Sequence, residues 1–238
     1  MLHKNRPRKN NRQHKHHRLH TKNIPKKGYI KQIKRNLYAT ISLETDEIIP
    51  TRYKIASTIT NGTYLSHHTA FEYYGCANQV FNTTYVSGKT RFTPFEFDDI
   101  NYKYIYPRLT VGIVENTDGV RTTDMERTIL DSINDFEKIT GIGELLRCLE
   151  LIPYANENKL LHYLKLYNKQ ILYQKTGYIL SYFKDTLRLS DKFFEKCKQA
   201  IGKSTRYLYI GIATENKVMF DKYWQLFVPK NLISKEKN

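Results

Sequence analysis

The chain has 238 residues, of which 40% are hydrophobic and 13% aromatic, and its formal net charge is +16. This composition excludes disorder throughout and supports one good core or two small ones, so we expect one or two domains. No apolar run approaches the ~20 residues that span a bilayer, and no apolar segment follows Met1. The sequence therefore predicts neither a membrane segment nor a signal peptide, and it indicates a cytoplasmic protein.

Positive charge is concentrated at the N-terminus. Residues 1–35 hold 13 Lys and Arg residues and no acid, whereas the remainder holds 26 basic and 23 acidic residues. A basic end on a nearly neutral body favours a polyanionic partner, and the lack of an apolar face argues against a membrane-lying helix. Residues 1–25 hold five of the eight His residues and few aliphatics, so we predict a disordered basic tail without a metal site.

The three cysteines, Cys76, Cys148 and Cys197, lie far apart and follow no metal-ligand spacing. They fit reduced thiols that fill a core better than a disulfide framework or a zinc site. His67 and His68 also have no Cys or carboxylate at metal spacing, so we expect them on a helix surface. No metal ion and no other cofactor is predicted.

A β-hairpin is predicted where the basic segment meets the body. Two short runs, residues 29–33 and 37–41, alternate apolar residues on either side of a turn at residues 34–36. Lys31, Lys34 and Arg35 would lie on its solvent side or at its tip, where a phosphate backbone can reach them. We interpret the hairpin as a DNA-contacting wing, with Lys26 and Lys27 just ahead of it.

The next elements are two short helices. Pro50 suits the first turn of a helix that runs to about Ile59 and stops at residues 61–62. Ser66 is the expected N-cap of a helix over residues 67–74, with Glu72 on its exposed face and Gly75 as its stop.

In residues 79–114 the apolar residues recur with a period of two, which predicts a small, largely antiparallel sheet. The expected strands are residues 80–87, 90–97, 102–106 and 110–114, with Gly112 marking a bulge or a close backbone approach. A helix with one apolar stripe should begin near residues 122–126 and continue to residue 133. Further helices are predicted over residues 143–152, 157–167, 170–183 and 190–201, with Gly177 as a kink site, and residues 223–229 can form an edge strand.

Four segments, in order, carry a resemblance to a known family. They are Lys27-Gly28-Tyr29-Ile30-Lys31-Gln32-Ile33-Lys34-Arg35-Asn36-Leu37-Tyr38, Tyr64-Leu65-Ser66-His67-His68-Thr69-Ala70-Phe71-Glu72-Tyr73-Tyr74-Gly75, Val120-Arg121-Thr122-Thr123-Asp124-Met125-Glu126-Arg127-Thr128-Ile129-Leu130-Asp131, and Lys175-Thr176-Gly177-Tyr178-Ile179-Leu180. Each is short and unspecific alone, but their order and spacing together are informative. The chain resembles the AbiEi family of antitoxins, the DNA-binding partners of nucleotidyltransferase toxins in type IV toxin–antitoxin and phage-exclusion operons.

The resemblance covers about residues 26–205 and, together with the composition and patterns above, indicates an α+β protein in four parts. These are the basic tail (residues 1–25), a remnant or partial winged helix with its wing (26–60), an antitoxin body with a small sheet and a helical C-terminal part (61–205), and an extension (206–238). A full family member has helices, including a recognition helix, ahead of the wing, and here the basic tail occupies that space. The DNA-binding candidates are Lys26, Lys27, Lys31, Lys34 and Arg35.

The other motif residues have no chemistry that we can assign from the sequence. They are Ser66, Ala70, Gly75, Glu126, Arg127, Asp131, Gly177 and Tyr178. Arg127 and Asp131 are spaced to pair as i, i+4 neighbours on a helix, which favours a structural role in capping or in joining sheet to helix.

The resulting hypothesis is a non-enzymatic antitoxin and transcriptional autoregulator that binds its own operator DNA. The toxin is its functional partner without an assumed complex, and the oligomeric state stays open, with a homodimer among the options. One alternative is a metal-dependent nuclease, because residues 157–159 and 215–217 both read Glu-Asn-Lys. Another is a protein-interaction module that does not bind DNA.

Overall fold

The computed structural model describes residues 28–214, 218–230 and 232. The basic tail, Lys26, Lys27 and the tripeptide at residues 215–217 lie outside the described residues. The described residues divide into two compact units, with the boundary between Ile55 and Ala56, and each is described by itself. None of the helices in the described ranges has the length and apolar character needed to cross a membrane.

The first unit contains the predicted hairpin. Strands β1 (Ile30–Lys34) and β2 (Leu37–Thr40) pair antiparallel, with an irregularity between Gln32 and Lys34. Asn36 adopts a left-handed backbone (φ 63°) in the turn, a conformation that Asn tolerates better than most residues. Thr51 then accepts the backbone N–H of Lys54 at the start of helix α2 (Arg52–Thr58), which continues past the boundary between the units.

The second unit carries a mixed sheet of six strands in the order β5-β6-β4-β3-β8-β7. Its strands are β3 (Tyr64–Leu65), β4 (Thr83–Ser87), β5 (Phe95–Phe97), β6 (Ile100–Tyr104), β7 (Ile113–Glu115) and β8 (Arg121–Thr123). The pairs β3/β4, β5/β6 and β7/β8 are antiparallel, while β3/β8 and β4/β6 are parallel. The predicted α+β class with a mostly antiparallel sheet is confirmed.

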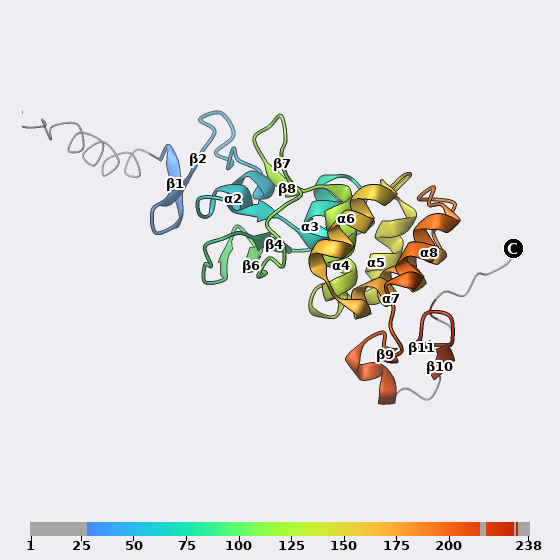
Figure 1. Cartoon of the computed structure of the whole chain (residues 1–238). Helices are drawn as coiled ribbons and strands as arrows, with labels where there is room; N and C mark the ends of the chain where they lie inside the picture. The colour runs from blue at the N-terminus through green and yellow to red at the C-terminus, as the bar shows by residue number, and fades with distance from the viewer. Residues whose placement is uncertain (1–27, 215–217, 231, 233–238) are drawn as a thin grey trace, which may run out of the picture. The chain divides into compact units, whose positions relative to one another are not determined.

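Helices pack beside this sheet (Figure 1). They are α3 (His67–Tyr73), α4 (Met125–Asp135), α5 (Gly141–Glu150), α6 (Glu157–Tyr167), α7 (Gln170–Ser181) and α8 (Asp191–Gln199), with a 3-10 turn η2 (Phe136–Lys138). Asp124, Asn156 and Ser190 accept backbone N–H groups at the starts of α4, α6 and α8. The fully buried side chains of Ile129, Leu130 and Leu160 belong to the core that joins these helices.

A second, three-stranded sheet completes this unit. It has the order β10-β11-β9, formed by β9 (Arg206–Tyr207), β10 (Val218–Asp221) and β11 (Leu226–Pro229), with a 3-10 turn η3 (Ile210–Thr214). The segment expected to form an edge strand is therefore the central one. It pairs with β10 on one side and β9 on the other, and its Leu226 and Val228 side chains are fully buried in the core.

Other local predictions need correction. The strand expected over residues 90–97 is reduced to Phe95–Phe97, since Pro94 has no N–H to donate to a ladder. Helix α7 runs through Gly177 without an end there, and a Cβ at this position would lie 2.1 Å from the Trp224 ring. Gly177 thus permits close packing against Trp224, and the kink expected there stays a prediction. At Gly112 (φ 72°) the predicted close approach is present, because a Cβ would lie 2.7 Å from the Tyr163 hydroxyl.

Candidate functional site

The hairpin brings Lys31, Lys34 and Arg35 into one small element, called here the basic hairpin (residues 30–40). Lys31 and Arg35 are exposed and Lys34 is half-buried beside the turn. Ala39, which pairs with Lys31 on the same face of the hairpin, is buried, whereas the paired residues Gln32 and Tyr38 on the other face are exposed. No acid occurs between residues 28 and 43. Long cationic side chains on such an element suit contacts with a phosphate backbone.

Arg127 has the opposite environment, with no exposed surface. Its Nε donates to Asp131 Oδ1 at 2.7 Å, and its two terminal nitrogens donate to the carbonyls of Val111 and Leu109 at 2.7 and 3.1 Å. The Tyr167 hydroxyl also donates to Asp131. Arg127 therefore fastens α4 to the segment ahead of β7, which is the structural role expected from its sequence spacing.

Asp124 and Glu126 extend this group of charges toward α6. Asp124 caps α4 and also accepts the Tyr163 hydroxyl at 2.7 Å and the Lys159 ammonium at 3.2 Å. Glu126 accepts the N–H of Asn156 at 2.8 Å and lies 3.6 Å from Lys159. Partial burial works against the charge on Lys159, but the two carboxylates raise its pKa. We call Asp124, Glu126, Arg127 and Asp131, with Tyr163, Tyr167 and the exposed Lys159 at the edge, the buried charge cluster.

The side chains of the Glu-Asn-Lys motif at residues 157–159 do not come together in one site. Glu157 accepts hydrogen bonds from the Ser190 hydroxyl and N–H at 2.7 and 3.1 Å, whereas Lys159 turns to Asp124 and Glu126. The two side chains expected to hold a cation and orient water in a nuclease thus have separate partners.

Ser66, Ala70 and Gly75 have packing and turning roles around α3. The Ser66 hydroxyl makes no cap bond and instead lies 2.9 Å from Ser87 Oγ and 2.8 Å from His67 Nδ1. Ala70 is fully buried, and Gly75 takes the left-handed conformation (φ 72°) that ends a helix, as predicted.

The late motif at Gly177 and Tyr178 is also buried. The Gly177 backbone lies against Trp224, and the Tyr178 hydroxyl accepts a hydrogen bond from Tyr182 at 3.2 Å. Burial raises the pKa of Tyr178. Gly177 thus packs against the segment between β10 and β11, while Tyr178 pairs with Tyr182 at the end of α7.

The prediction that His67 and His68 lie on a helix surface is wrong, as is the exposed placement of Glu72. All three side chains are buried, the two histidines with 2% exposure each. His67 has a left-handed backbone (φ 56°), uncommon for a residue with a Cβ, and its Nε2 lies 3.7 Å from Asp135.

His68 lies between two buried carboxylates. Its Nδ1 is 3.0 Å from Glu72 and its Nε2 is 3.2 Å from Glu144. The i, i+4 spacing of His68 and Glu72 is a local signal that could have been noticed in the sequence. Glu144 is 76 residues away from His68, and no local pattern announces that contact.

Comparisons with known proteins give a fold relationship. No family model matches the chain, and no curated protein matches it significantly in sequence. In solved structures, it is similar to the crystal structure of the RV2827C protein from Mycobacterium tuberculosis, with a TM-score of 0.62 and 12% identity. The match covers 87% of this chain and 78% of that one. At this identity the likeness shows a shared fold and nothing more about function.

Proposed function

We propose that this protein is a cytoplasmic DNA-binding antitoxin and transcriptional autoregulator that acts against a nucleotidyltransferase toxin. The observation that carries the proposal is the basic hairpin, which follows directly on the most basic segment of the chain. Residues 1–35 hold 13 basic and no acidic residues, and Lys31 and Arg35 are exposed. The four-segment resemblance to AbiEi antitoxins supplies the type of operon and the toxin class.

Contacts to phosphates account for the binding that we propose. Each Lys or Arg that neutralises a phosphate releases counterions, so affinity falls as salt rises. Such contacts position a protein on DNA without reading its sequence. The basic hairpin supplies this class of contact, and we propose no base-reading residue.

The DNA test uses the full chain and a fragment from upstream of its own gene. Replacement of both Lys34 and Arg35 by Ala should weaken binding and lower the slope of log affinity against log salt by about 2, roughly 0.9 for each lost phosphate contact. The matched control replaces the exposed Lys192 and Lys196 of α8 with Ala. This control removes the same charge from another element. If both double variants weakened DNA binding equally, the hairpin would contribute only through its net charge, and the proposed phosphate contacts would be contradicted.

The same samples test the nuclease alternative. Incubation of the DNA with protein and Mg²⁺ should leave it intact, and cleavage that disappears in Glu157→Gln or Lys159→Ala would contradict a non-enzymatic role. Neutralisation is tested separately in cells. Expression of the chain should restore growth when a nucleotidyltransferase encoded beside its gene is induced, and a failure to restore growth would remove the antitoxin assignment.

A further inference from the structure

A cluster of three potential metal ligands lies inside the second unit. His68 of α3 faces Glu144 and Cys148 of α5, and all three are buried. His68 Nε2 lies 3.2 Å from Glu144 Oε1, and Cys148 Sγ lies 3.7 Å from the same oxygen. One nitrogen, one oxygen and one sulfur thus lie within 4.8 Å of one another.

Two of the three separations, both measured to Glu144 Oε1, suit a tetrahedral zinc ion, and the third, between His68 Nε2 and Cys148 Sγ, lies within 4.8 Å. Zinc binds nitrogen, oxygen and sulfur at ~2.0–2.3 Å, so two ligand atoms on a tetrahedron around it lie roughly 3.4–3.6 Å apart. The observed 3.2 and 3.7 Å bracket that range. Glu144 and Cys148 are four residues apart on α5, a spacing that places both on one face of a helix.

Arg147 holds Glu144 by a hydrogen bond, and Glu72 lies beside the second ligand, His68. Arg147 donates to Glu144 Oε2 at 3.1 Å, which leaves Oε1 directed at His68 and Cys148. Glu72 lies 3.0 Å from His68 Nδ1 and also accepts the Phe81 N–H at 3.0 Å. A proton on Nδ1 between His68 and Glu72 would leave the Nε2 lone pair available to a metal. Donation of that proton to Glu72 would give the carboxylate–histidine pair that usually supports a metal-binding imidazole.

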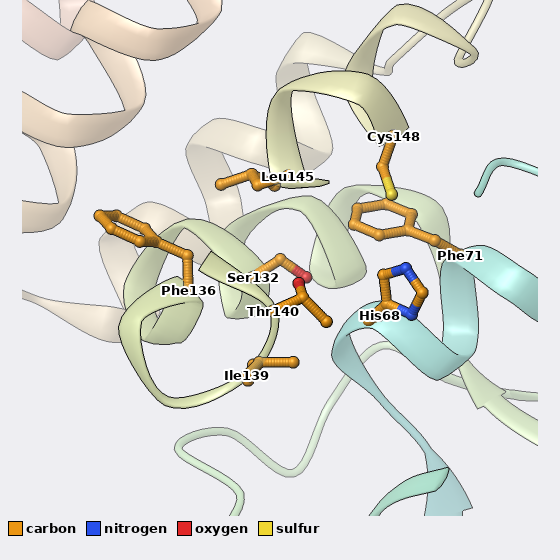
Figure 2. A pocket seen from close by; sticks show the side chains of 8 residues that line it. All are labelled: His68, Phe71, Ser132, Phe136, Ile139, Thr140, Leu145 and Cys148. Atoms are coloured by element: carbon orange, nitrogen blue, oxygen red, sulfur yellow. The ribbon is translucent and has the colours of Figure 1, made fainter. Parts of the chain in front are cut away.

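A cavity of about 10 Å³ adjoins the cluster, enough for about one water (Figure 2). His68 and Cys148 line it together with Ser132 and Thr140. The buried Ser132 Oγ has no hydrogen-bond partner in the described part of the chain. A metal-bound water in this cavity would complete the tetrahedron and could donate a hydrogen bond to that hydroxyl.

We propose that His68 Nε2, Glu144 Oε1 and Cys148 Sγ bind one Zn²⁺ ion, with a water as the fourth ligand. Cys148 binds as a thiolate after its proton passes to solvent. The ion joins α3 to α5, two helices that are distant in the sequence. This site is independent of the DNA-binding proposal, and it goes against the sequence-based expectation that the cysteines only fill the core.

Cobalt is the best probe of this site, because a thiolate ligand gives Co²⁺ a charge-transfer band in the near ultraviolet. Titration of the metal-free full chain with Co²⁺ should produce this band with an end point at one equivalent, and Zn²⁺ should abolish it. Cysteine occurs only at positions 76, 148 and 197, so the His residues near the N-terminus cannot produce the signal. Cys148→Ser should remove the band. Cys197→Ser, the loss of another fully buried thiol, should retain it.

A second variant keeps the proposal testable if Cys148→Ser fails to fold. Glu72→Gln leaves all three ligands in place and should weaken cobalt affinity by about 10–100-fold, the usual effect of removing an outer partner. The absence of a thiolate band in the folded, metal-free wild-type chain would overturn the proposal. So would a band of equal strength in Cys148→Ser. Either result would mean that the three side chains form only a hydrogen-bonded cluster.

Discussion

The basic hairpin and the buried charge cluster use the same residue types for different purposes. Arg35 is exposed at the hairpin turn, whereas Arg127 has no exposed surface and donates to Asp131 and two backbone carbonyls. A guanidinium whose donors already serve protein acceptors cannot also reach a phosphate. Net charge alone therefore does not identify the cations that can contact a polyanion, because the position of each cation decides whether it is accessible.

The largest effect should follow from breaking the buried pair. Arg127→Met leaves the Asp131 carboxylate buried without its cation, and we expect the free energy of unfolding to fall by about 3–5 kcal/mol. Urea denaturation of the full chain measures this loss. Arg35→Met is the matched control and should change stability by less than about 0.5 kcal/mol while weakening DNA binding. If Arg127→Met and Arg35→Met lowered the free energy of unfolding by similar amounts, the two arginines would not have different structural roles.

A double variant distinguishes the energy of the Arg127–Asp131 charge pair from that of the other contacts of Arg127. Replacing Asp131 with Leu in the Arg127→Met background removes the uncompensated charge, so part of the lost stability should return. If the double variant were as unstable as the sum of both single changes, the contacts of Arg127 with Val111 and Leu109 would dominate instead.

Local patterns predicted the hairpin and the structural role of Arg127 because both depend on residues close in sequence. Helix α6 was predicted with its observed bounds, since Asn156 caps its start and Asn168 takes the left-handed conformation at its end. The Arg127–Asp131 pair follows from the i, i+4 spacing.

Long-range packing decided what the sequence could not predict. His68 was placed on a surface because its partner Glu144 comes from another helix, α5. The last strand was placed at an edge because β9 and β10, which flank it, are short runs with weak patterns. The two-residue strand β3 was missed for the same reason, although it lies between β4 and β8.

A moderate effect is expected from a residue whose role is close packing without charge. Gly177→Ala would place a methyl group 2.1 Å from the Trp224 ring, so we expect a loss of about 1–3 kcal/mol despite the better helix propensity of Ala. Gly143→Ala in α5 meets no atom within 4 Å and should be neutral or stabilising by up to about 1 kcal/mol. Equal changes at both glycines would show that Trp224 moves away freely.

The smallest effect concerns Asp135, a buried carboxylate at the end of α4. It should appear only in how the free energy of unfolding depends on pH. Burial alone would raise the pKa of Asp135, but His67, Lys138 and Asn134 together hold it well below its usual value. A carboxyl whose pKa is lower in the folded than in the unfolded chain stabilises the fold above the unfolded pKa, about 3.9 for Asp. That contribution is lost as pH falls below this value toward the folded pKa.

Asp135→Asn should therefore make the free energy of unfolding depend less steeply on pH between about pH 5 and pH 2. The control is Glu195→Gln, which removes an exposed carboxylate of α8. Urea midpoints measured across this range compare the two variants with the wild-type chain. If Asp135→Asn and the wild-type chain lose stability in parallel, the carboxylates that drive acid unfolding lie elsewhere, and His67 holds its position through packing and backbone conformation alone.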